Sequence, residues 1–391
     1  MILIKGGNVH LPTGESQSCD VLIDGKKIAG VGEGLSAGPD CETISAVGKE
    51  VFAGFISPIT SVGCMDMTSI RQPDSMDTSN PVTAQLDVKD SMDHREVLLQ
   101  QYYFTGITAF GLSPGTKNLV SGIMGVYNTD GKNNAQMTVR NGVALKGNFI
   151  SDVKGAYGKR GVAPMTKMGC ASLLRTALVE ARDYSEKKAD ADGDKSKLPP
   201  FDQGKETLGR LLARELTFFV HAKTQAEILT VIEIAKEFSL KLVLTNACQA
   251  DKCAEEIKKA GIPVVLPMFY TMGYEAEYDI DFKKLIKMAD EGVQFSVSSS
   301  GDSGFAGRET LLWCAIKLYN EGFDAESVIK MLTINPASML GVDDVIGSIE
   351  TGKQADIAIY NAHPVKTYAA DVDTCIVAGK VTYRKGECAN A

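Results

Sequence analysis

The sequence lacks several features that would assign it to a specialised class of protein. No apolar run approaches the length of a membrane-spanning helix, and the first residues show no signal-peptide pattern. Nine cysteines are scattered from Cys19 to Cys388 without the spacing of a disulfide framework, so we expect reduced thiols. Positive charge is not in excess, because 41 Lys and Arg face 49 Asp and Glu, for a net charge of -8. We therefore expect a cytoplasmic protein with no electrostatic reason to bind nucleic acid or an anionic membrane.

Histidine is also scarce, with four residues in a chain of 391. His10 and His363 fall in segments that we expect to be β-structure, and His94 lies in a polar stretch. Only His221, at the end of an apolar strand pattern, is placed for chemistry. A catalytic zinc site normally uses three protein ligands and keeps one position for water. We therefore predict no standard metal ligand set.

The composition that is present, 44% hydrophobic and 23% charged, is typical of a globular chain that buries a large core. Both ends of the chain have the pattern of short strands separated by turns, and we expect them to share one sheet domain. The predicted strands of this unit are residues 2–5, 20–23, 27–31, 42–45, 355–360, 374–377 and 381–383.

Between the two ends, strand and helix patterns alternate. In the clearest unit, strand 216–221 is followed by a helix that starts at the capping box Thr224 to Glu227, and then by strand 241–245. Eight strands that alternate with helices predict a (β/α)₈ barrel. These strands are residues 51–56, 107–112, 122–127, 143–146, 216–221, 241–245, 262–266 and 294–297. The charged segment 185–204 is predicted to be a mobile loop.

Two motifs carry a family resemblance. Residues 53–61, Ala-Gly-Phe-Ile-Ser-Pro-Ile-Thr-Ser, resemble the first barrel strand of the amidohydrolase superfamily. Residues 333–337, Thr-Ile-Asn-Pro-Ala, and the segment 347–356 are similar to the exit of that family's barrel into its β domain. The segments 80–85, 113–122 and 164–184 resemble its imidazolonepropionase-like, prolidase-type subgroup.

The resemblance implies an α/β fold with a (β/α)₈ TIM barrel over residues 53–349 and a composite β-sandwich domain from residues 1–52 and 350–391. It also implies hydrolysis of non-peptide C–N bonds with a divalent metal such as zinc. From the residues themselves, no cofactor is predicted.

The family's metal-binding positions carry other residues here. Ile59 and Ser61 stand where the family has the two histidines of its first strand, and neither is a good zinc ligand. The histidine of strand five is kept as His221, whereas Asn246 replaces that of strand six.

Two further positions are matched by residues of different chemistry. At strand eight, Ser300 aligns with the family's catalytic aspartate, and Asp302 follows two residues later. At strand four, Lys146 aligns with a carbamylated lysine or glutamate that bridges metals. We predict His221, Asp302 and Lys146 as catalytic candidates, and Asn246, Ser300, Cys248 and Ser61 as substrate-binding candidates.

Each of these candidates also has a structural interpretation. His221 is either a remnant of the active site or a core histidine. Lys146 is either a carbamylated ligand or pocket cation, or an ordinary lysine that extends from a strand end to solvent. Asp302 is either a general base or a helix N-cap.

Cysteine offers alternative chemistry at the barrel mouth. A Cys248 thiolate paired with His221 would be a nucleophile beside a base. A replacement metal site would combine His221 with Cys64, Cys248 and Cys253. Buried, inert cysteines are the simpler interpretation.

Three hypotheses follow for function. The first is an amidohydrolase-like barrel that has lost its metal centre and binds a small-molecule ligand in the barrel mouth. The second is an active hydrolase of cyclic amide or related C–N bonds that uses His221 and Asp302. The third is a structural subunit of an assembly, and a homo-oligomer is compatible with all three.

Overall fold

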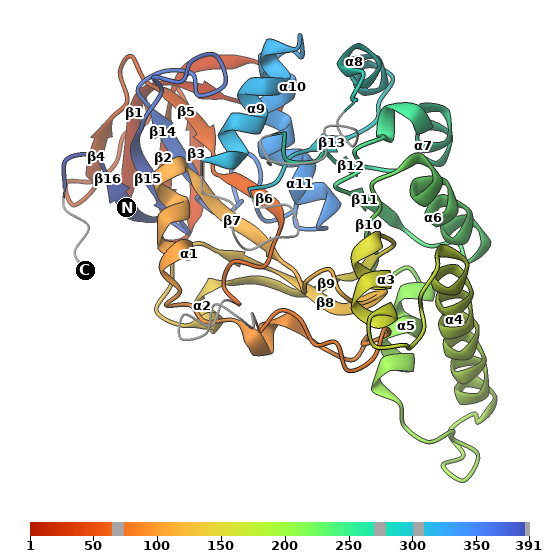
Figure 1. Cartoon of the computed structure of the whole chain (residues 1–391). Helices are drawn as coiled ribbons and strands as arrows, with labels where there is room; N and C mark the ends of the chain where they lie inside the picture. The colour runs from red at the N-terminus through yellow and green to blue at the C-terminus, as the bar shows by residue number, and fades with distance from the viewer. Residues whose placement is uncertain (65–73, 270–278, 300–308, 388–391) are drawn as a thin grey trace.

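The computed structural model describes residues 1–64, 74–269, 279–299 and 309–387. These residues form two eight-stranded sheets and the helices that pack on them (Figure 1). In Figure 1 one sheet lies on the side of α1 and α10, and the long helices α4 and α6 lie on the far side of the other sheet. In the described part of the chain, every helix is too short or too polar to cross a membrane.

The first sheet, which we call the terminal sheet, combines strands from both ends of the chain. Its strands are β1 Ile2–His10, β2 Ser16–Asp24, β3 Lys27–Gly32, β4 Glu42–Ser45, β5 Glu50–Ala53, β14 Ile357–Tyr360, β15 Val372–Val377 and β16 Lys380–Arg384. Their order is β16-β15-β14-β5-β1-β2-β3, with β4 beside β1. The antiparallel pair β5–β14 therefore joins the two ends of the chain.

The second sheet follows the chain from one edge to the other in sequence order and is almost closed. Its strands are β6 Phe55–Thr60, β7 Ile107–Leu112, β8 Val120–Asn128, β9 Thr138–Asn148, β10 Thr217–His221, β11 Leu242–Thr245, β12 Val264–Val265 and β13 Phe295–Ser296. Beyond β13, the backbone N–H of Ser299 donates to Oγ of Ser57 on β6 at 3.1 Å. This bond brings the two edges of the sheet together into a barrel.

One strand corrects the predicted (β/α)₈ pattern. β8 is antiparallel to both β7 and β9, whereas the other neighbours in the barrel are parallel. The connection from β7 to β8 is residues 113–119, and a parallel crossover needs a dozen residues or more. The barrel is therefore mixed, and a hairpin on each side of β8 replaces the expected helices.

The helices cover the outer face of the barrel and its ends. The α-helices are α1 Val97–Tyr102, α2 Asn134–Met137, α3 Ser151–Gly158, α4 Lys167–Asp190, α5 Gln203–Leu212, α6 Gln225–Glu237, α7 Ala254–Ala260, α8 Phe282–Asp290, α9 Thr310–Asn320, α10 Ala325–Leu332 and α11 Ile334–Met339. Short 3₁₀ helices occupy Val88–Ser91 (η1), Tyr103–Thr105 (η2) and Ala250–Cys253 (η3).

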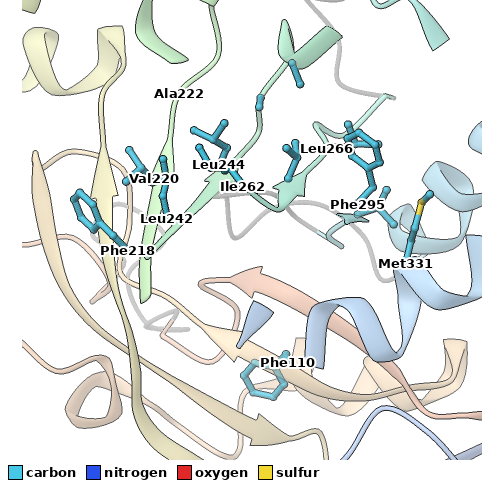
Figure 2. Packing of buried hydrophobic residues seen from close by; sticks show 14 of the residues in the cluster. Phe110, Phe218, Val220, Ala222, Leu242, Leu244, Ile262, Leu266, Phe295 and Met331 are labelled. Carbon is cyan, nitrogen blue, oxygen red and sulfur yellow. The ribbon is translucent and has the colours of Figure 1, made fainter. Parts of the chain in front are cut away.

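The strands of the barrel divide their side chains between two apolar clusters. Phe218 and Val220 of β10 join the outer cluster, which reaches from Phe110 to Met331 of α10 (Figure 2). Phe219 between them belongs to a separate interior cluster. This interior cluster consists of Ile56, Ile59, Ala109, Met124, Val126, Ala144, Phe219, Val243, Val265, Ala337, Met339, Leu340, Val342 and Ile346. The alternation is that of strands with both faces buried.

The interior cluster fills the barrel from the amino ends of its strands. Residues 337–346 contribute to it, and Arg140 near the amino end of β9 donates to Asp344 at 2.7 Å. The opposite end, where the parallel strands terminate, is left to polar side chains.

Two local predictions have clear outcomes. The capping box is confirmed, because the Thr224 side chain accepts from the Glu227 N–H and the Glu227 carboxylate accepts from the Thr224 N–H. The predicted mobile loop 185–204 is partly wrong, because α4 continues to Asp190 and α5 begins at Gln203. The domain boundaries predicted near residues 52 and 350 stay a prediction.

Candidate functional site

Two layers of side chains face the barrel interior where β9, β10 and β11 end. The strand register pairs His221 with Asn148 and with Thr245, so these residues form one layer. Lys146 pairs with Phe219 in the layer below, and Phe219 belongs to the interior cluster. Because alternate residues of a strand share a face, these side chains point into the barrel. We call the carboxyl ends of β6, β7 and β9 to β13 the barrel mouth.

Lys146 is completely buried and donates hydrogen bonds within its own strand. Its Nζ donates to the Gly147 carbonyl at 2.9 Å and to Asn148 Oδ1 at 2.6 Å. Asn148 Nδ2 in turn donates to the Asn118 carbonyl at 2.7 Å and to Ser121 Oγ at 2.9 Å. A lysine that extends to solvent is therefore the wrong interpretation, and Lys146 is a buried polar group of the barrel.

His221 ends β10 and is buried, with 4% of its surface exposed. Its carbonyl accepts a hydrogen bond from the Phe149 N–H at 2.8 Å, which ties β10 to the segment that follows β9. The position at the barrel mouth is the one predicted from the strand pattern. The catalytic role of His221 stays a prediction.

A chain of buried hydroxyl groups lines the seam between β6 and the segment after β13. Ser57 Oγ lies 2.9 Å from Ser299 Oγ, which lies 2.9 Å from the Tyr102 hydroxyl. The Tyr102 hydroxyl is 3.2 Å from Thr60 Oγ1. These groups hold the seam closed and bring α1 to the barrel mouth.

The two positions of the first barrel strand that we predicted to be replaced have different surroundings. Ile59 is completely buried in the interior cluster, among apolar side chains. Ser61 follows the end of β6, is 6% exposed, and accepts a hydrogen bond on its carbonyl from the Cys64 N–H. Substrate binding by Ser61 stays a prediction.

Asn246 directly follows β11 and adopts a left-handed backbone conformation, with φ of 49°. Asparagine is one of the few residues that tolerate this conformation. Its carbonyl accepts hydrogen bonds from the Cys248 N–H at 2.9 Å and from Cys248 Sγ at 3.4 Å. Asn246 therefore has a backbone role that is independent of any contact to substrate, and binding by Asn246 and Cys248 stays a prediction.

The proposed replacement metal site made of cysteines does not form. Burial raises the pKa of Cys64 well above its ordinary value, and the carboxylates of Glu96 and Asp74 add to the effect. Burial, with Glu256 and Asp251, raises the pKa of Cys253 to about 12. Within the described ranges, no group of three possible metal ligands includes these cysteines or His221. This hypothesis is therefore wrong.

Two predicted site residues, Ser300 and Asp302, lie outside the described residues. Their predicted roles at strand eight stay predictions. The last described residue before them, Ser299, is buried in the hydroxyl seam.

A cavity of about 170 Å³ adjoins the hydrogen-bond network around Lys146. Its wall includes Asn118 and Ser121 of that network and the carboxylates of Asp74, Asp77 and Asp87. Hydrogen bonds from the Ser79 hydroxyl and N–H lower the pKa of Asp77. The acidic lining favours a ligand with a positive charge or N–H donors.

The residues that sequence reasoning missed come mainly from the β8 hairpins. Asn118 precedes β8, donates to Thr83 Oγ1 at 2.7 Å, and accepts from the Tyr157 hydroxyl at 2.7 Å. No recognised motif marks it. The sequence did offer a reason to predict Asn148 as a site residue, because it stands two residues after Lys146 on the same face of a strand.

Comparison with known proteins finds a family similarity in the second half of the chain. Residues 211–382 match the model described as the amidohydrolase family. Over these residues the chain is similar to the amidohydrolase family. The span begins just before β10, includes His221 and Asn246, and ends in β16.

Relatives extend the amidohydrolase likeness to nearly the whole chain. A crystal structure of an amidohydrolase from Thermotoga maritima MSB8 is 28% identical, covers 98% of this chain and 100% of that chain, and superposes with a TM-score of 0.91. Amidohydrolase tasK of Hapsidospora irregularis is 23% identical over 385 residues, which are 91% of this chain and 39% of tasK. An imidazolonepropionase of Clostridium tetani is 31% identical over 111 residues, which are 27% of this chain and 26% of that protein.

These comparisons support a likeness of the chain to the amidohydrolase family and its imidazolonepropionase-like relatives. They also support a TIM-barrel-like α/β fold. The chain spans 39% or less of the length of the two curated relatives named above.

Proposed function

We propose that the barrel mouth of this amidohydrolase-family chain binds a small polar molecule and does not perform the usual metal-assisted hydrolysis. The observation that carries the proposal is the set of side chains that face the mouth. His221 is a nitrogen ligand of the kind that zinc prefers, but Ile59 has no ligand atom and lies in the interior cluster. Among the described residues of the mouth, three zinc ligands do not come together.

Lys146 adds a second observation. Its Nζ donates to the Gly147 carbonyl and to Asn148 Oδ1, so the amine is engaged in hydrogen bonds of its own strand. The described residues therefore do not fit the metal centre that the family implies.

The cavity beside Asn118 and Ser121 supports the binding role. Its volume of about 170 Å³ exceeds the space that a single water molecule occupies. Lys117 on its wall is engaged by Asp152 at 3.0 Å and Asp87 by Lys89 at 2.8 Å, so the carboxylates of Asp74 and Asp77 leave the lining negative. We infer that a cationic or amide-bearing small molecule is the ligand class.

Metal analysis combined with activity assays tests the proposal. The purified protein is analysed for bound zinc, manganese, iron and nickel and assayed with cyclic amides. We expect no hydrolysis of the cyclic amides. We also expect the His221→Ala variant to keep any metal that the wild type binds. A stoichiometric metal that disappears in His221→Ala together with hydrolysis of a cyclic amide would overturn the proposal.

Ligand binding gives the positive test. A library of small amines, amides and amino-acid derivatives is screened by thermal shift. We expect binders that raise the Tm of the wild type and lose at least tenfold in affinity in Asn118→Ala. Lys385→Met, which removes a lysine paired with Asp371 in the terminal sheet, serves as the control and keeps full affinity. Equal affinities in Asn118→Ala and the wild type contradict the assignment of the cavity.

A second candidate function is hydrolysis of a C–N bond by His221, Asp302 and Lys146. It is favoured by the match to the Thermotoga maritima amidohydrolase over 98% of the chain. This function requires turnover that depends on pH and falls at least a hundredfold in Asp302→Asn. Wild-type rates in Asp302→Asn would rule it out.

A further inference from the structure

A cluster of two histidines and a glutamate lies outside the barrel mouth, between the terminal sheet and α10. His10 ends β1, Glu326 is in the first turn of α10, and His363 follows β14. One ligand atom from each residue lies within 4.8 Å of the other two. Figure 1 shows α10 beside the terminal sheet, at the place where these three segments meet.

The spacing of the three groups suits a tetrahedral zinc ion. His10 Nδ1 is 3.1 Å from Glu326 Oε2, and His363 Nε2 is 3.6 Å from the other carboxylate oxygen, Oε1. Zinc bonds of about 2.0–2.1 Å in a tetrahedron place neighbouring ligand atoms roughly 3.3–3.4 Å apart. Two histidines and a glutamate are also a known protein donor set for zinc.

A second carboxylate orients His10 in the manner of many metal-bound histidines. Glu50 Oε2 lies 2.7 Å from His10 Nε2 and accepts a further bond from Asn8 Nδ2 at 2.7 Å. A proton on Nε2 that is donated to Glu50 leaves the lone pair of Nδ1 directed at Glu326. The Phe52 ring stacks on the His10 ring at 4.0 Å and fixes its plane.

The present hydrogen bonding leaves the cluster incompletely satisfied. His10 stands between two carboxylates, with Nε2 2.7 Å from Glu50 and Nδ1 3.1 Å from Glu326. His363 is 9% exposed, and its Nε2 has no hydrogen-bond partner within the described part of the chain. A metal ion between these atoms would satisfy all of them.

Ligation has one local cost. The Val365 N–H lies 3.3 Å from His363 Nδ1, and binding of a metal at Nε2 would put the ring proton on Nδ1. That contact is long for a hydrogen bond and would be given up.

A small cavity adjoins two of the three groups. It measures about 20 Å³, is lined by His10 and Glu326 together with Lys330, Thr333 and Ser348, and has room for one water molecule.

We propose that His10, Glu326 and His363 bind one zinc ion, with a water molecule as the fourth ligand. The ion joins β1 and the segment after β14 to α10, and so fastens the terminal sheet to the barrel. This site is separate from the barrel mouth and does not depend on the function proposed for it.

Zinc titration of the full chain tests this site. The protein is stripped with EDTA, and zinc affinity is measured by competition with a chromophoric chelator. We expect one zinc ion per chain in the wild type. Glu326→Gln and His363→Asn should each weaken zinc binding at least a hundredfold, and Glu50→Gln should weaken it 10- to 100-fold.

Two histidine variants are the matched controls. His221→Ala removes the histidine of the barrel mouth, and His94→Asn removes one that is 29% exposed beside Asp93. Both should keep the zinc affinity of the wild type and the rise in Tm that zinc causes. If zinc bound at the barrel mouth instead, His221→Ala would lose it and His363→Asn would keep it, which would overturn this proposal.

Folding of the variants is checked by circular dichroism in EDTA. If a variant does not fold, cobalt is bound in place of zinc to the wild type and to His221→Ala, and the visible spectra of the two proteins test the site. Intense visible bands of tetrahedral cobalt in both proteins support the site. A wild type that binds neither metal at micromolar concentration, or binds cobalt with the weak bands of octahedral coordination, refutes it.

Discussion

Asn246 illustrates how a backbone requirement can explain a residue that the sequence resemblance predicts to be a replacement. Its left-handed conformation at the end of β11 is tolerated by asparagine and glycine and costs a residue such as alanine about 1 kcal/mol. An asparagine at this position is therefore explained by the backbone, whether or not the family has a histidine there.

A pair of substitutions separates the two roles of Asn246. Asn246→Ala should destabilise the fold by about 1 kcal/mol more than Asn246→Gly, because only glycine keeps the conformation without strain. Urea unfolding measures the difference. If the side chain also contacts a ligand, both variants should weaken binding equally, whereas equal stabilities would remove the backbone explanation.

Asp356 gives the molecule a specific dependence on pH. Burial raises its pKa from 3.8 to about 6, although bonds from the Ala378 N–H and the Gln354 amide act in the opposite direction. The folded state therefore holds this proton more tightly than the unfolded state does. The stability linked to it is complete below pH 3.8 and is lost as the pH rises through about 6.

Asp356→Asn removes this titration. Relative to the wild type, the variant should gain roughly 3 kcal/mol of stability between pH 4 and pH 7, from 1.36 kcal/mol for each unit of difference in pKa. Urea unfolding of both proteins at four pH values in this range measures the gain. A constant difference across the range would show that the carboxyl group does not titrate there.

Site residues were predictable to the extent that a strand pattern places them. The register places His221 and Lys146 in adjacent layers of the barrel interior, because residues two apart along paired strands share a face, and their catalytic roles stay predictions. The Asn118 and Asn148 network was not predictable. It depends on the hairpins around β8, which bring together side chains 27 to 39 positions apart.

At the scale of elements, β8 shows what a strand pattern leaves open. The predicted strand 122–127 exists within β8, but apolar alternation carries no information about direction. The length of the connection does indicate the strand direction, because seven residues, 113–119, are too few for a helical crossover. The loop prediction at the charged end of α4 was wrong for another reason. A solvated helix and a polar loop have similar compositions, so composition does not distinguish them. Tyr184 and Lys188 there both bond Glu206 of α5.

The capping box of α6 supports a prediction with a control in the same helix. Thr224→Ala should destabilise the fold by about 1 kcal/mol, because the Glu227 N–H loses the side-chain acceptor of the helix cap. Thr230→Ala, whose hydroxyl donates only to a carbonyl of its own helix, should change stability by less than about 0.5 kcal/mol. Thermal unfolding of both variants tests the pair, and equal losses would contradict the role of the cap.

At the scale of the whole molecule, Gly379 marks where the C-terminal hairpin meets the N-terminal one. Its φ is 77°, and a Cβ atom there would lie 1.9 Å from the carbonyl oxygen of Gly25. Gly386 also has a positive φ, of 87°, but a Cβ atom there would meet nothing.

Gly379→Ala should therefore destabilise the protein by about 3 kcal/mol or more, whereas Gly386→Ala should cost only the strain of about 1 kcal/mol. Denaturant unfolding of the two variants measures this contrast. If both cost the same, close packing of the two ends of the chain is not important for stability.

The pairing of β5 with β14 also sets the order in which the protein can be completed during translation. β5 ends at Ala53, and its partner begins at Ile357, so the ribosome makes about 300 residues before the pair can form. Until then, the N-terminal strands present an open sheet edge of the kind that promotes aggregation. The nascent chain therefore depends on chaperones or on early barrel collapse to protect that edge, and a ribosome that stalls within the barrel region leaves a product that cannot finish its first sheet.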